Sequence, residues 1–107
     1  MKIFGNPPFK LPASFKGEFN ILGIEDKCKE ACIFAYQNLK QTKRVQTLIL
    51  IEPKENLPFL KEIKDTKCKI YFFLKERDFK EAKKYAPYGI VFLSNTPVAF
   101  YNLFQSL

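Results

Sequence analysis

Three apolar runs of this 107-residue sequence are each followed within two residues by carboxylate side chains, namely Glu25, Asp26, Glu52 and Glu76. Carboxylate oxygens are the hard ligands that Mg²⁺ prefers. In an open parallel sheet, ligands bind outside the carboxyl ends of the strands, so these acids could converge on a metal ion. A structural role fits the same residues, because Asp26 could cap a helix whose positive end favours Glu25.

The residues ILGIED at 21–26 resemble, over that strand end alone, the acidic pair of phospho-acceptor receiver domains. Glu25 stands where that family has aspartate. The chain also lacks the family's fifth βα unit and its Lys-Pro near the end. No activity is carried over from so short a resemblance.

Phosphate binding would need one of two turns that precede expected helices. The turn GIEDKCK holds a single glycine, whereas GxGxxG and P-loop motifs need several so that the backbone can approach phosphate. Nucleotide binding in the usual mode is therefore disfavoured. Ser94, Asn95 and Thr96 precede the last expected helix and could offer hydroxyls and backbone N–H groups to an anion, although an ordinary capped turn has the same composition.

Cysteine and histidine content excludes several kinds of site. Cys28 and Cys32 lie four residues apart, where both thiols could face one metal ion. Cys68 heads a separate strand and the chain has no histidine, so a Cys₄ or Cys₂His₂ zinc site cannot form within one chain. Both helical thiols fall on an apolar stripe, where free cysteine packs as a small hydrophobe. We expect core packing, no metal and no cofactor, and the missing histidine favours a non-catalytic protein.

Apolar runs and helical patterns alternate along the chain. Short, nearly continuous apolar runs are typical of strands covered on both faces, and their alternation with helices predicts right-handed crossovers in a parallel sheet. We therefore predict a small three-layer α/β domain, Rossmann-like or flavodoxin-like, at 18–107. The expected strands lie at 18–24, 45–51, 68–74 and 89–93, and the expected helices at 26–41, 56–66, 78–86 and 97–107.

Helix starts and the N-terminal segment add detail to this plan. Asp26, Asn56, Asp78 and Thr96 each stand where an N-cap belongs. Residues 1–17 hold three of the seven prolines and read as an extended arm rich in phenylalanine. Within the arm, Ile3-Phe4 could add a short edge strand.

The charge balance raises the alternative of nucleic-acid binding. The chain has 18 basic and 11 acidic residues, a net charge of +7. Arginine is the preferred residue for bidentate contacts to phosphate and guanine, yet Arg44 and Arg77 are the only arginines. A nucleic-acid interface would use Lys40, Lys43, Arg44, Lys61, Lys64 and Lys67.

The C-terminal segment carries no charged side chain after Lys84. In the last helix apolar residues occupy nearly the whole circumference, and such a helix is buried on more than one side. A terminal helix of a small domain is covered by its own core on one side only. A second copy of the chain, another protein or the N-terminal arm could cover the rest. We predict a dimer or partner interface centred on Phe100, Tyr101, Phe104 and Leu107.

Together these patterns favour a basic, cytoplasmic, non-catalytic module for protein interaction or assembly, most simply a homodimer. Three cysteines at irregular spacing favour a reducing compartment, and polar residues interrupt the tail too often for a membrane span. A small or vestigial enzyme using the acidic strand ends remains the alternative, beside nucleic-acid binding.

Overall fold

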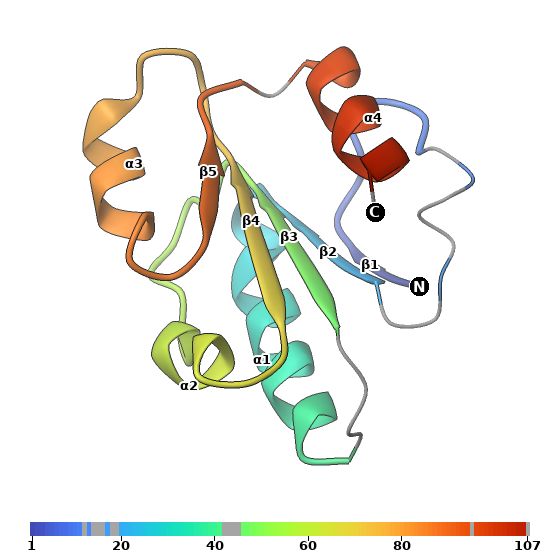
Figure 1. Ribbon diagram of the computed structural model, residues 1–107, viewed down its shortest axis with the longest axis vertical. Coiled ribbons are helices and arrows are strands. Elements are labelled where there is room, and N and C mark those ends of the chain that lie inside the picture. The colour runs from blue at the N-terminus through green and yellow to red at the C-terminus, as the bar shows by residue number, and fades with distance from the viewer. Residues whose placement is uncertain (12, 14–16, 18–19, 42–45, 95, 107) are drawn as a thin grey trace.

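A computed structural model describes residues 1–11, 13, 17, 20–41, 46–94 and 96–106 of the chain, with 104–106 described by backbone alone (Figure 1). Five strands form one parallel sheet in the order β1-β2-β3-β4-β5. The predicted α/β class is confirmed. The sheet has one strand more than the four main runs, because β1 comes from the arm, where Ile3 and Phe4 were expected to add an edge strand. The strands are β1 Lys2–Phe4, β2 Asn20–Ile24, β3 Thr47–Ile51, β4 Lys69–Phe73 and β5 Ile90–Phe92.

The helices form two layers, one on each face of the sheet. They are α1 Cys28–Leu39, preceded by the 3₁₀ turn Glu25–Lys27, then α2 Leu60–Lys64, α3 Phe79–Tyr85 and α4 Pro97–Ser106. Because βαβ crossovers are right-handed, a sheet that grows in one direction has all its crossover helices on the same face. Figure 1 shows α1, α2 and α3 on one side of the sheet and α4 with the N-terminal segment on the other.

The strand order has a consequence for ligand binding. A doubly wound sheet reverses its direction of growth, and the crevice at that switch point is where such folds bind ligands. Receiver domains, whose acidic pair the residues 21–26 resemble, have such a reversal in their strand order. Among the described strands the order runs from β1 to β5 without a reversal, so these strands form no switch-point crevice at their carboxyl edge.

The core explains why the strand runs are almost continuously apolar. Alternate residues of a strand point to opposite faces. In β3, Leu48 and Leu50 pack toward α1 and α2, while Ile49 and Ile51 pack toward α4. All four are at most 2 % exposed, which confirms the expectation that both faces of the strand are covered.

Two of the four expected helix caps are observed. Asp78 accepts a hydrogen bond from the Glu81 N–H, and Thr96 Oγ1 accepts one from Ala99. Asp26 instead lies inside the 3₁₀ turn, and Lys27 precedes α1 with no side-chain cap. The second helix begins four residues after Asn56, because Pro58 disfavours helical geometry at Leu57 and Phe59 has a left-handed φ of 66°.

The arm and α4 cover the second face of the sheet together. The Phe100 ring lies 5.3 Å from that of Phe73 in β4 and meets the Phe9 ring edge-on at 4.5 Å. Ile3 and Leu11 add partly buried contacts to this cluster. The arm therefore covers part of α4 in cis, which was one of the three expected ways to bury an uncharged helix.

Candidate functional site

The carboxyl edge of the sheet is shaped by residues in left-handed backbone conformation. Glu25 and Glu52 directly follow the paired strand ends Ile24 and Ile51, with φ of 51° and 45°, and Arg77 has φ of 64° in the turn before α3. Left-handed conformation is costly for residues other than glycine. Each of these residues turns the chain sharply away from the sheet.

The acids at this edge do not form a metal centre. Across the described part of the chain, no group of three or more His, Cys, Asp or Glu side chains is placed to hold a metal ion. Glu25, Asp26 and Glu76 are exposed, and Glu52 is partly buried. The geometric support expected for a metal-dependent enzyme is therefore missing among these four residues.

A small cleft of about 110 Å³ does lie at this edge, between the loops that follow β3 and β4. One carboxylate oxygen of Glu52, Oε1, is buried there without a hydrogen-bond partner. The wall carries three acids and two lysines, so the cleft has only a small excess of negative charge. Its lining residues are Glu52, Pro53, Lys54, Leu74, Lys75, Asp78 and Glu81.

Replacing Glu52 by glycine is expected to raise the free energy of unfolding by about 1 kcal/mol, measured from the urea midpoint. The change relieves a left-handed residue and removes the buried, unpartnered Oε1 atom. Glu55→Gly is the matched control, because Glu55 is exposed in the same loop and has no positive φ. Glu55→Gly should lower the free energy of unfolding by up to about 1 kcal/mol, because glycine raises the conformational entropy of the unfolded chain. Equal losses in both variants would contradict this account of Glu52.

The turn before α4 uses its hydroxyls internally. Thr96 Oγ1 caps the helix through the Ala99 N–H at 3.2 Å, and Ser94 Oγ accepts the Thr96 N–H at 3.4 Å. Asn95 lies outside the described residues. An anion at this turn would have to displace the cap, so the geometry is that of an ordinary capped turn.

The three cysteines belong to the core, as the apolar stripe predicted for Cys28 and Cys32. Cys28, Cys32 and Cys68 are buried on the α1 side of the sheet. Burial raises the pKa of each thiol, and neighbouring thiols raise those of Cys28 and Cys32 further. The Cys28 thiol donates to the Ile51 carbonyl at 3.6 Å. Buried, protonated thiols are poor nucleophiles and poor metal ligands.

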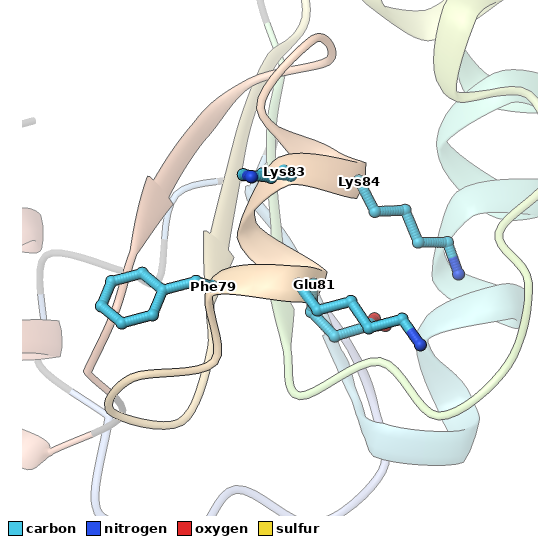
Figure 2. A pocket seen from close by; sticks show the side chains of 5 residues that line it. Phe79, Glu81, Lys83 and Lys84 are labelled. Carbon is cyan, nitrogen blue, oxygen red and sulfur yellow. The ribbon is translucent and has the colours of Figure 1, made fainter.

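A hollow of about 630 Å³ lies over the outer surface of α3, but its side chains do not converge. Figure 2 shows Phe79 and Lys84 pointing in opposite directions from the helix. Phe79 is 61 % exposed. With no shared focus for a ligand, this surface lacks the convergent polar groups of a binding site.

The lysines proposed for nucleic acid are not arranged as one track. Lys61 and Lys64 lie on α2, which ends at Lys64, so Lys67 is not on the same helix. Lys40 lies 4.5 Å above the Tyr36 ring. Lys43 and Arg44 are outside the described residues. The expected row at every third residue is interrupted by the end of the helix.

The predicted interface residues divide into buried and exposed positions. Phe100 is 1 % exposed and belongs to the core, so in this conformation it is not available to a partner. Tyr101 is 50 % exposed on the outer side of α4. The Phe104 side chain and Leu107 lie outside the described part.

Sequence patterns missed two exposed apolar residues in the uncharged segment, Val98 of α4 at 68 % and Ile90 of β5 at 56 %. Val98 borders a hollow of about 290 Å³ that Tyr101 and Phe9 also line. Ile90 was assigned to a buried strand, and only the observed edge position of β5 reveals its exposure.

Comparisons with protein-family models, curated proteins and solved structures give no match to this chain. Over the described residues, no helix combines the length and apolar character needed to cross a membrane. The site residues must therefore be interpreted from their own geometry.

Proposed function

We propose that this protein is a non-catalytic assembly module that self-associates through its uncharged C-terminal segment, residues 85–107. The observation that carries the proposal is that Ile90, Val98 and Tyr101 are each at least half exposed in a segment without charge. Large apolar side chains exposed on uncharged elements are typical of interface cores.

Charge favours a second copy of the chain as the partner. Each chain carries a net charge of +7, so most pairs of surfaces on two copies would bring lysines together. The segment after Lys84 is where two copies can approach without that repulsion. Closed two-fold symmetry is also the commonest arrangement of soluble homo-oligomers. The three unpaired, buried cysteines suit a reducing compartment, for which we propose the cytoplasm.

Light scattering behind a sizing column tests this function across a range of loading concentrations. The wild-type chain is expected to approach twice the mass of one chain as concentration rises. A triple variant, Ile90→Lys, Val98→Lys and Tyr101→Lys, is expected to stay monomeric with an unchanged circular dichroism spectrum, because all three positions are exposed. A wild-type chain that stays monomeric at every concentration rules out self-assembly.

A further inference from the structure

We infer that the outer edge of β5 is the surface that pairs, by antiparallel strand addition, with β5 of a second copy. This inference rests on the proposed assembly function and names the element that carries it. The expected product is one continuous ten-stranded sheet, formed by two copies of the five-stranded sheet around a two-fold axis.

The backbone of β5 presents unpaired hydrogen-bonding groups at this edge. Within the described residues, β5 has a neighbouring strand on one side only. The Phe92 carbonyl accepts the Leu74 N–H from the chain that continues β4, at 2.9 Å. Because backbone groups of successive strand residues point to opposite sides, the N–H and C=O of Val91 point away from β4 toward the open edge.

The edge lacks the features that protect strand edges from pairing. Natural edge strands are protected by charged side chains, prolines or bulges. At the opposite edge of the sheet, β1 begins with the exposed Lys2. In contrast, β5 and its flanking residues read GIVFL, and the exposed side chain there is Ile90.

Two-fold symmetry fixes how two such edges would pair. A two-fold axis normal to the sheet makes identical strands antiparallel, and the outward-pointing Val91 lies at its centre. The two Val91 residues then exchange both backbone hydrogen bonds. On the α4 face, Ile90 lies opposite Phe92 of the partner subunit, so the most exposed side chain of the strand becomes covered by an aromatic ring.

A second copy suits this edge better than an unrelated strand. The strand side chains that would face each other are all uncharged, so the strand pairing itself places no lysine against another despite the charge of each chain. Because the contact is symmetric, it covers Ile90 in both copies. Because β5 has only three paired residues, the dimer should dissociate on dilution.

Three single variants, compared by sedimentation velocity over a dilution series, test the inference. Ile90→Lys puts a charge opposite Phe92 of the partner subunit. Val91→Pro removes the outward N–H but no hydrogen bond within the chain. Val98→Lys adds the same charge to an exposed position on α4 and measures how much that helix contributes to the contact. Thermal unfolding of each variant checks that it remains folded.

The expected result is at least tenfold weaker dimerisation in Ile90→Lys and Val91→Pro, with a smaller loss in Val98→Lys. If Val91→Pro does not fold, Ile90→Lys decides alone. A dimer that survives Ile90→Lys but is lost in Val98→Lys overturns the β5 inference and leaves assembly through α4 standing. A wild-type chain that is monomeric throughout the series overturns both the inference and the proposed function.

Discussion

Replacing Gly23 by alanine is expected to lower the free energy of unfolding by about 3 kcal/mol or more, measured by urea denaturation. Gly23 lies in β2 directly under α1. An added Cβ would stand 2.7 Å from Ala31 Cβ and 2.9 Å from Cys28 Cα, which belongs to the helix backbone. Neither atom is the end of a flexible side chain, so the helix would have to move away from the sheet. The loss is large beside the roughly 5–15 kcal/mol that stabilises a typical domain.

Two further variants isolate this cause. At Gly17 an added Cβ first meets the Asn20 side-chain amide at 3.2 Å, which can move aside. Gly17→Ala should therefore change stability by less than about 0.5 kcal/mol. Combining Gly23→Ala with Ala31→Gly removes one of the two close contacts and should recover part of the loss. Equal midpoints for wild type and Gly23→Ala would show that α1 does not pack this closely.

Raising the pH above 9 is expected to unfold the protein steeply. Burial, with the neighbouring Cys68 second, raises the pKa of Cys32 from 9.0 to about 12, and burial raises that of Cys68 to about 12. Burial also raises the pKa of Cys28. Their stabilisation is complete below pH 9 and is lost as pH rises toward 12, because unfolded thiols release protons that native thiols keep. When unfolding releases three such protons, the free energy of unfolding falls by about 4 kcal/mol per pH unit.

The contribution of each thiol can be separated from that of the lysines. Unfolding of Cys32→Ala releases one proton fewer than unfolding of the wild type. Between pH 9 and 11 its free energy of unfolding should therefore fall less steeply with pH, and the two slopes should differ by about 1.4 kcal/mol per pH unit. Lysine titration is common to both proteins and cancels in the comparison. Urea midpoints in reducing buffer measure both slopes. Parallel pH profiles for the variant and the wild type would contradict the assignment of buried, protonated thiols.

The sequence was most informative where burial dictates residue type. The runs VQTLILI and CKIYFFL predicted strands covered on both faces, and β3 and β4 are buried as that pattern requires. The caps at Asp78 and Thr96 were also correct, because a short polar side chain before a periodic segment has one favoured use.

Features that depend on the relative placement of elements could not be predicted. The apolar runs do not say which strand neighbours which, so the order without a reversal was not expected. The edge position of β5 follows from that order, and with it the exposure of Ile90. The parallel arrangement did place Glu25 and Glu52 at one edge, but whether carboxylates meet depends on the left-handed turns that orient them.

The uncharged C-terminal segment shows both what residue type predicts and what it does not. Its apolar character predicted that more than the sheet covers α4; Phe9 of the arm does contact Phe100, but Val98 and Tyr101 stay exposed. Residue type alone could not separate the buried Phe100 from the neighbouring Tyr101, which is half exposed. The remaining exposed apolar side chains are those on which the proposed assembly rests.

Hydrogen–deuterium exchange at low and high protein concentration tests the central claim, assembly through the C-terminal segment, most directly. Amides in 88–106 are expected to exchange more slowly at high concentration while the rest of the chain is unchanged, with the largest effect at Val91. Slower exchange confined to another surface, or no dependence on concentration in any segment, would contradict it.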